Sequence, residues 1–252
     1  MNALKIRGLT KRRGDFVLRG LELTLPAGCI MGLIGENGAG KSTTIRLILN
    51  ALSRDGGTVA VYGKDNRALT PLEREDIGAV LDEVGLPEYM TARQIGCMMA
   101  DIFTCWQPEV YRDYLRRLAL PEDKPFRDFS RGMKMKQGLA VALSHQPKLL
   151  LLDEATSGLD PVVRDEILTI FADFTRDEEH AVLISSHIVS DLEKICDYIA
   201  FLHKGRLLLC EEKDRLTEEY GILRGGTDGI APAAVCGRHA TPYGTEYLVR
   251  RS

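Results

Sequence analysis

The stretch Gly35-Glu-Asn-Gly-Ala-Gly-Lys41-Ser42 decides the fold of this chain, because it fits the pattern GxxxxGK[ST]. It follows an apolar run at 29–34, typical of a buried strand, and precedes helical spacing of apolar residues at 43–52. Glycines let successive backbone N–H groups point inward, and the helix N-terminus adds partial positive charge. The stretch predicts a loop that binds nucleotide phosphates, with Lys41 on the β- and γ-phosphates and Ser42 on Mg²⁺.

Apolar runs and helical patterns alternate along the rest of the chain. Short strands are expected within 3–28, and a hairpin at 199–209 turns at Lys204-Gly205. Further strands are predicted at 58–62, 77–81, 149–152 and 181–185, with a helix at 162–175. Because strands alternate with helices, an α/β fold with a mostly parallel sheet is favoured.

Two regions depart from this alternation. Helical spacing at 87–144, broken at Pro108, Pro121 and Pro125, predicts a helical lobe (about 87–145) inserted between strands. After a polar helix at 211–220, the glycine-rich residues 225–229 indicate a linker, and 243–249 a last strand. We therefore expect one main domain over 1–220 and an extension over 221–252, either a small α/β appendage or a flexible end.

Composition sets bounds on the class of protein. With 44% hydrophobic residues, 252 residues can bury a sizeable core, and the net charge of −3 gives no overall bias toward nucleic acid or acidic lipid. The six scattered cysteines form no CxxC pair, which favours reduced thiols over disulfides or a zinc site. The chain start lacks a signal-peptide core, and no run approaches the ~18 apolar residues of a membrane span.

Polar residues end two of the predicted strands at the sheet edge where ligands bind. Asp153, after the run at 149–152, is placed to hold Mg²⁺ through its water shell, and Glu154 to orient an attacking water. His187 ends the next strand, where a polar side chain can touch a γ-phosphate. Taken alone, each has a plainer interpretation, as a charged strand end or a structural histidine.

Two further helices begin with capping residues. Ser130 is a natural N-cap for a helix at 134–144, which makes that helix start either a second phosphate contact or a plain cap. Residues 157–161 (Ser-Gly-Leu-Asp-Pro) start another helix, with proline in its first turn.

Four motifs stand in a fixed order: GENGAGKST (35–43), FSRGMKMKQ (129–137), LLLLDEATSGLD (149–160) and ISSH (184–187). Over about residues 3–220 they resemble the nucleotide-binding subunit of ATP-binding cassette (ABC) transporters. The resemblance implies a P-loop NTPase fold with a mostly parallel core sheet, an N-terminal antiparallel β subdomain and an inserted helical lobe.

The resemblance also implies a composite ATP site, in which two copies pair head to tail. Ser130 and Gly132 of one copy would close on the γ-phosphate held by the other copy's loop. Glu154 would be the general base, Asp153 the Mg²⁺ residue and His187 the γ-phosphate contact, while Asp160 would bridge the two halves. The loop residues carried over are Gly35, Asn37, Gly38, Ala39, Gly40, Lys41, Ser42 and Thr43.

The sequence departs from the family pattern at several positions. In the usual LSGGQ segment, Arg131 replaces a glycine and Met133 the glutamine, a version similar to that of the ATPases of small ABC-2-type exporters. Asp82 stands in place of a glutamine and could approach Mg²⁺. The usual adenine-stacking aromatic is absent near Arg13, so either Phe16 or the guanidinium plane of Arg13 is expected to stack.

The function implied is an ATPase that powers a separate membrane-spanning exporter of peptide, drug or similar cargo. Such a subunit would dock through its helical lobe onto a permease at the cytoplasmic face of the membrane. Its other partner would be a second copy or a similar ATPase, with no nucleic acid. Two alternatives stay open: a soluble cassette acting in DNA repair, translation or iron–sulfur assembly, and a phosphate-loop kinase of small metabolites.

Overall fold

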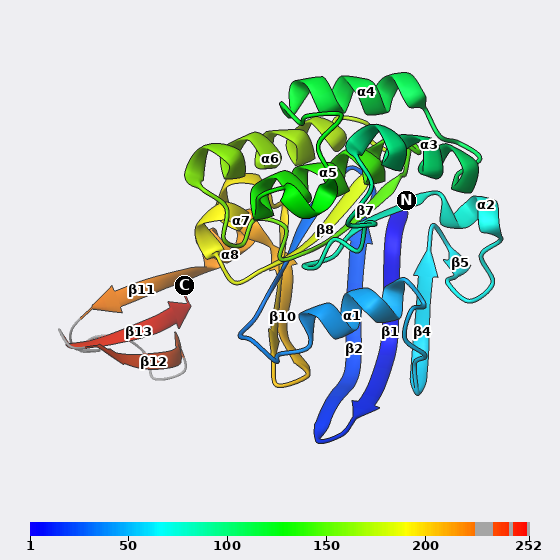
Figure 1. Cartoon of the computed structure of the whole chain (residues 1–252). Coiled ribbons are helices and arrows are strands. Elements are labelled where there is room, and N and C mark those ends of the chain that lie inside the picture. The colour runs from blue at the N-terminus through cyan, green and yellow to red at the C-terminus, as the bar shows by residue number, and fades with distance from the viewer. Residues whose placement is uncertain (225–233, 242–243, 251–252) are drawn as a thin grey trace. The chain divides into compact units, whose positions relative to one another are not determined.

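A computed structural model describes residues 1–224, 234–241 and 244–250 of the chain (Figure 1). It divides into two compact units, Met1–Cys210 and Glu211–Ser252. The predicted linker at 225–229 lies outside the described residues. Among those that are described, no helix is both long and apolar enough to span a membrane.

A six-stranded sheet forms the centre of the first unit, in the order β10-β9-β3-β8-β7-β6. The pairs β9–β3, β3–β8, β8–β7 and β7–β6 are parallel, so the expected mostly parallel sheet is confirmed. At its edge, β9 and β10 form the predicted hairpin, and Lys204 and Gly205 turn with positive φ. The strands are β3 (Ile30–Ile34), β6 (Ile77–Val80), β7 (Leu149–Asp153), β8 (Ala181–Ser186), β9 (Tyr198–His203) and β10 (Arg206–Glu212).

This sheet is buried on both faces, which explains its uninterrupted apolar strands. Alternate residues of β7 face two different cores: Leu149 and Leu151 belong to one, and Leu150 and Leu152 to the other. The same alternation runs along β3 and β8. The strand ends that follow these runs therefore reach one common edge, where the polar residues Asp153 and Ser186 stand.

A second, antiparallel sheet covers one face, in the order β2-β1-β4-β5. The prediction of short strands within residues 3–28 is wrong, because the segment forms two long strands joined by a turn at Gly14 and Asp15. Register shifts between β1 and β2 let a strand this long stay paired. The strands are β1 (Asn2–Arg13), β2 (Phe16–Pro26), β4 (Gly56–Val61) and β5 (Lys64–Asp65).

Helices cover most of the other face of the central sheet (Figure 1). In the expected helical lobe, Pro108 begins a helix, as its missing N–H allows at a first turn. Tyr111 donates to the Ala92 carbonyl (2.7 Å) and accepts from buried Gln137, and burial raises the pKa of Tyr111 to about 12. The helices are α1 (Lys41–Ile48), α2 (Pro71–Arg74), α3 (Ala92–Ile102), α4 (Pro108–Arg117), η1 (Phe126–Asp128), α5 (Arg131–Leu143), α6 (Pro161–Phe174) and α7 (Val189–Ile195).

The second unit contains a helix and a three-stranded sheet in the order β11-β13-β12. The elements are α8 (Lys213–Glu219), β11 (Tyr220–Arg224), β12 (Val235–Thr241) and β13 (Gly244–Arg250). Our sequence analysis put the domain boundary after residue 220, whereas the first compact unit ends at Cys210. The difference arises because α8 packs against β11 of the tail sheet.

Asn66 fixes the end of α1, the helix that follows the phosphate loop. Its amide donates to the carbonyls of Leu47 and Ile48 (2.8 Å each), and its oxygen accepts from Arg54 (2.5 Å). The residue is 2% exposed. The bond to Ile48 satisfies a carbonyl that the helix C-terminus leaves without an intrahelical partner, and the bond to Leu47 adds to the one that its carbonyl accepts from the Asn50 N–H (3.2 Å).

Replacing Asn66 by alanine should therefore lower the free energy of unfolding by about 1–3 kcal/mol, since the Ile48 carbonyl loses its donor. Urea denaturation followed by circular dichroism measures this loss. The exposed Asn2→Ala change serves as the control and should cost less than about 0.5 kcal/mol. An unchanged urea midpoint for Asn66→Ala would contradict this role.

Candidate nucleotide site

The phosphate loop connects β3 to α1, and close approach requires its glycines. A Cβ at Gly35 would lie 2.4 Å from the Leu202 carbonyl oxygen, and one at Gly40 would lie 2.7 Å from Cζ of Phe16. Gly40 also has a φ of 114°, which glycine adopts without strain. The loop therefore packs directly against β9 and Phe16.

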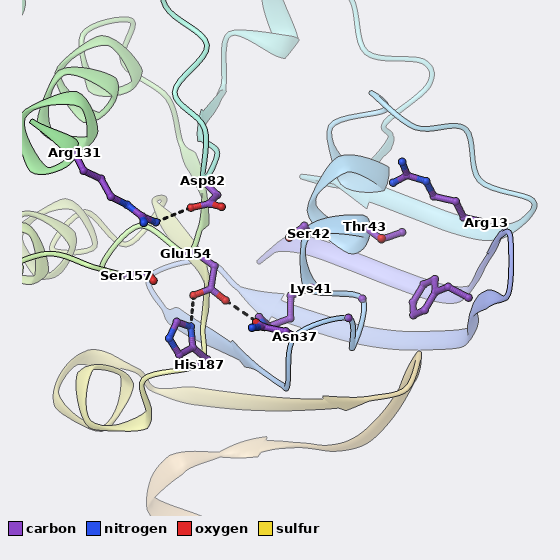
Figure 2. Close-up of a pocket in the computed structure, with 13 residues that line it drawn as sticks. Arg13, Asn37, Lys41, Ser42, Thr43, Asp82, Arg131, Glu154, Ser157 and His187 are labelled. Carbon is purple, nitrogen blue, oxygen red and sulfur yellow. Dashed lines mark hydrogen bonds and ion pairs between the residues drawn. The ribbon is translucent and has the colours of Figure 1, made fainter. Parts of the chain in front are cut away.

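Lys41 begins α1 and is only 5% exposed. Its Nζ donates to the carbonyls of Gly35 (2.8 Å) and Glu36 (3.3 Å), and lies 3.2 Å from Oε1 of Glu154. A buried ammonium group needs such partners, because it has left water. The amine is thus held at the centre of the loop, directly opposite a carboxylate (Figure 2).

Asp153 ends β7 and is 2% exposed. One of its oxygens accepts the hydroxyl hydrogen of Ser185 at 2.7 Å. Ser185 lies on β8, and its hydroxyl and carbonyl oxygens both accept the backbone N–H of Glu154, at 3.1 Å. Ser185 therefore orients the Asp153 carboxylate and holds the backbone of Glu154, a role that the sequence analysis did not assign to it.

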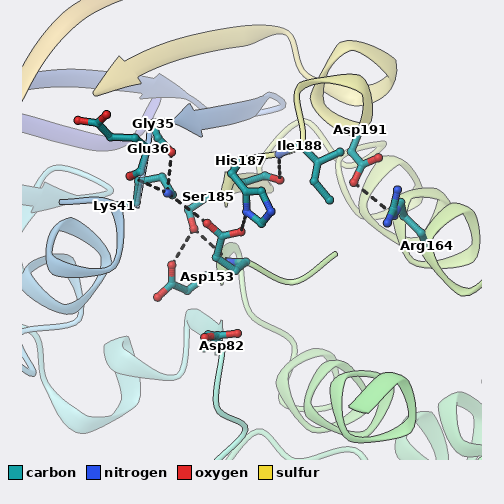
Figure 3. A network of polar contacts seen from close by, with 12 residues as sticks. Gly35, Glu36, Lys41, Asp82, Asp153, Arg164, Ser185, His187, Ile188 and Asp191 are labelled. Atoms are coloured by element: carbon teal, nitrogen blue, oxygen red, sulfur yellow. Dashed lines mark hydrogen bonds and ion pairs between the residues drawn. The ribbon is translucent and has the colours of Figure 1, made fainter. Parts of the chain in front are cut away.

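Glu154 has a positive φ of 53°, rare for a residue with a side chain. Its carboxylate lies between Lys41 and His187, with Oε2 at 2.7 Å from His187 Nδ1 and Oε1 at 3.2 Å from the lysine Nζ (Figure 2). Figure 3 shows the neighbouring hydrogen bond between Ser185 and Asp153. The side chain is 14% exposed, so it faces solvent only in part. This turn aims the carboxylate along the sheet edge and into the cavity beside the phosphate loop.

A cavity of about 500 Å³, which we call the nucleotide cavity, brings most of the predicted residues together. Arg131 and Ser157 also line it, and the sequence analysis had not placed either of them there. Among the predicted residues, Gly35, Ala39 and Asp153 are buried and do not line the cavity. The predicted residues that line it are Arg13, Phe16, Asn37, Gly38, Gly40, Lys41, Ser42, Thr43, Asp82, Glu154 and His187.

Three predicted residues lie elsewhere. Ser130, Gly132 and Asp160 line a separate pocket of about 420 Å³, which we call the signature pocket. Ser130 caps α5 by accepting the Met133 N–H (3.3 Å), and Asp160 caps α6 by accepting the Val163 N–H (3.0 Å). Two capped helix starts thus share one opening, apart from Lys41 and Glu154.

Arg13 and Phe16 lie on opposite sides of the β1–β2 turn and both border the nucleotide cavity. The tip of the Phe16 ring packs on Gly40 of the loop. The guanidinium of Arg13 is exposed and forms no hydrogen bond or ion pair with a described residue. Either side chain is therefore within the cavity wall, and Arg13 is the one free to meet a base.

Comparison with known proteins is consistent across sequence and structure. Residues 18–157 match the ABC transporter family. The chain is 31% identical to an ABC transporter ATP-binding protein of Bacillus subtilis, YtrB, over 86% of this chain and 74% of that protein. It is 32% identical to the lantibiotic transport ATP-binding protein SrtF of Streptococcus pyogenes, over 84% and 91%. A solved ATP-binding subunit of an ABC transporter superposes with a TM-score of 0.77 at 25% identity, covering 85% of this chain and 91% of that one.

Proposed function

Since this chain belongs to the ABC transporter family and is the ATPase that powers a separate membrane transporter, we propose that each ATP is held between two head-to-tail copies. The observation that carries this proposal is the separation of two half-sites in one chain. Lys41 and Glu154 line the nucleotide cavity, whereas Ser130, Gly132 and Asp160 line the signature pocket. A head-to-tail pair would place the signature pocket of one copy over the nucleotide cavity of the other.

The residues of the nucleotide cavity then divide the work of hydrolysis. Lys41 and the loop amides bind the phosphate oxygens, and Glu154 accepts a proton from the attacking water. His187 holds Oε2 of Glu154 at 2.7 Å and so fixes the direction of that carboxylate. When Lys41 turns to phosphate, it releases Oε1 of Glu154, so that substrate binding frees the base.

The oxygen-rich side chains at the sheet edge fit Mg²⁺, which prefers hydroxyl, carboxylate and water ligands. Ser42 lines the nucleotide cavity, and Asp153 keeps one carboxylate oxygen outside its bond with Ser185. Asp82 borders the same cavity. We propose that Ser42 and Asp153 hold the ion, with Asp82 nearby. The bound ion would neutralise charge on the β- and γ-phosphates.

For the base, we propose that adenine stacks on the guanidinium of Arg13, because the Phe16 ring already packs on Gly40. Replacing Arg13 by alanine should then weaken ATP binding at least about five-fold, since base stacking is worth ~1–3 kcal/mol. Isothermal titration calorimetry with ATP and with inorganic tripolyphosphate measures the effect. Affinity for tripolyphosphate, which has no base, should stay unchanged.

Arg12→Ala is the matched control for this prediction, because Arg12 is exposed and does not line the nucleotide cavity. Phe16→Ala tests the other side chain. Full ATP affinity in Arg13→Ala, together with a loss in Phe16→Ala, would assign stacking to Phe16 instead.

We propose that the membrane partner docks on a groove of about 610 Å³ between the segment after β6 and the helical lobe. Its floor is apolar, with Phe126, Phe129 and Met135. Its lining also includes three exposed acidic side chains, Asp82, Glu83 and Glu88, and two basic ones, Lys134 and Arg131, of which Arg131 is paired with Asp82. Next to the lining residue Glu88, Tyr89 is 77% exposed. Since Asp82 is paired with Arg131, the carboxylates of Glu83 and Glu88 are the acidic groups beside the apolar floor, and together they suit a short helical segment that carries a basic residue.

We further propose that the chain works at the cytoplasmic face of the cell membrane and that the exported cargo is an antimicrobial peptide or a similar compound. The support is the relative named for lantibiotic transport. The test is to purify the tagged chain from detergent-solubilised host membranes and identify proteins that accompany it. We expect a multi-span membrane protein, and deletion of the chain should raise sensitivity to lantibiotics. Recovery without any membrane protein, and unchanged sensitivity, would overturn the exporter role.

A further inference from the structure

Arg131 is the one residue that the linings of the nucleotide cavity and the signature pocket share. It is the first residue of α5, directly after the cap Ser130. Figure 2 shows its guanidinium directed toward Asp82, on the side of the nucleotide cavity opposite Lys41. A residue of the segment that faces a second copy thus also places its charge in the cavity of its own chain.

Arg131 contacts two other segments that border the nucleotide cavity. Its Nη2 donates to Oδ1 of Asp82 at 2.9 Å, in the segment after β6. Its guanidinium also lies against Gly158, where a Cβ would be 3.3 Å from Nη1. The planar fork of arginine can make both contacts, whereas a lysine ammonium could pair only with the carboxylate.

The ion pair between Arg131 and Asp82 reduces the negative charge of the nucleotide cavity. Two carboxylates, Asp82 and Glu154, line a cavity that must accept a polyanionic triphosphate. Among the described residues, Glu154 pairs with Lys41 and His187, and Asp82 pairs with Arg131. Without that partner, Asp82 would repel phosphate, because unscreened like charges act over several ångströms.

We propose that Arg131 is a positioning residue for nucleotide binding in its own chain, because its guanidinium neutralises and holds Asp82. The proposal deepens the proposed function and rests on nucleotide binding at Lys41. Asp82 and Arg131 are also the two positions where a charged residue replaces the family's glutamine and glycine. Their 2.9 Å contact gives both departures one explanation: each charge compensates the other.

The test is a double-mutant cycle with ATP titrated into the single chain in EDTA, so that the triphosphate keeps its full charge. Arg131→Met should weaken metal-free ATP binding at least about three-fold, because Asp82 is left uncompensated. Asp82→Asn should strengthen it. The double variant should return to within about two-fold of the wild type. Adding Mg²⁺ should shrink the Arg131→Met loss, since the ion reduces the charge of the nucleotide.

Arg112→Met is the control, because it removes an exposed ion pair with Glu109 on α4, outside the nucleotide cavity, and should leave affinity unchanged. Arg131→Lys should weaken metal-free ATP binding less than Arg131→Met does. A double variant as weak as Arg131→Met would overturn the proposal and indicate that Arg131 binds phosphate directly. Wild-type affinity in Arg131→Met would also overturn it. Whether ATP brings two copies together is measured in a separate experiment. A failure there would contradict the composite site and would not affect the result of this titration.

Discussion

The Glu154→Gln variant should bind ATP as tightly as the wild type and hydrolyse it at least about a hundred-fold more slowly. Glutamine keeps the size of the side chain but cannot accept the proton of the attacking water. It also loses the charge that attracts Lys41 across 3.2 Å, so the amine is freer to reach phosphate. Phosphate release and ATP titration, measured on the same preparation, separate the two effects.

Because the nucleotide would persist in this variant, a closed pair of chains should accumulate in MgATP. Size-exclusion chromatography with light scattering detects it as a doubled mass. Glu178→Gln is the matched control, since Glu178 is exposed and does not line the nucleotide cavity. Turnover at the wild-type rate in Glu154→Gln would remove Glu154 from its role as base.

The second large effect is expected from Ser130→Arg, which should abolish hydrolysis and leave ATP binding to the single chain intact. Ser130 lines the signature pocket and not the nucleotide cavity, so the change removes the contact that this copy would make with the ATP held by the other copy and leaves its own phosphate loop intact. The change also removes the cap on the Met133 N–H, which costs about 1 kcal/mol of stability.

Ser130→Asn is the control for that cap, because asparagine also caps helices, and it should retain the fold and part of the activity. Thermal unfolding of both variants checks that the protein is folded at the assay temperature. A Ser130→Arg chain that loses ATP binding as a monomer would mean that Ser130 was assigned to the wrong half of the site.

Much of the central sheet could be predicted from local pattern. The run at 149–152 reads as a strand because both of its faces are buried, and the carboxylates after it must then lie at the sheet edge. Lys41 was predictable for a similar reason: the glycine pattern and the strand-to-helix context are contiguous in sequence. The ABC transporter family was likewise recognisable from the order of four motifs.

Contacts between distant segments were not predictable in this way. Asp82 and Arg131 lie 49 residues apart, and each is by itself only a departure from a pattern. Ser185 orients Asp153 and Glu154 through contacts that exist only once β7 and β8 pair. The length of β1 and β2 was also not predictable from local sequence pattern, because register shifts interrupt the alternation that marks a strand.

The central claim is that each ATP is bound between two chains, and mixing two inactive variants tests this claim most directly. A Lys41→Met chain keeps its signature pocket, and a Ser130→Arg chain keeps its phosphate loop, so a mixed pair has one intact composite site. Each variant alone should be inactive, and an equal mixture should recover up to about a quarter of the wild-type ATPase rate, as random pairing of two copies allows. A mixture no more active than its separate parts would contradict the account.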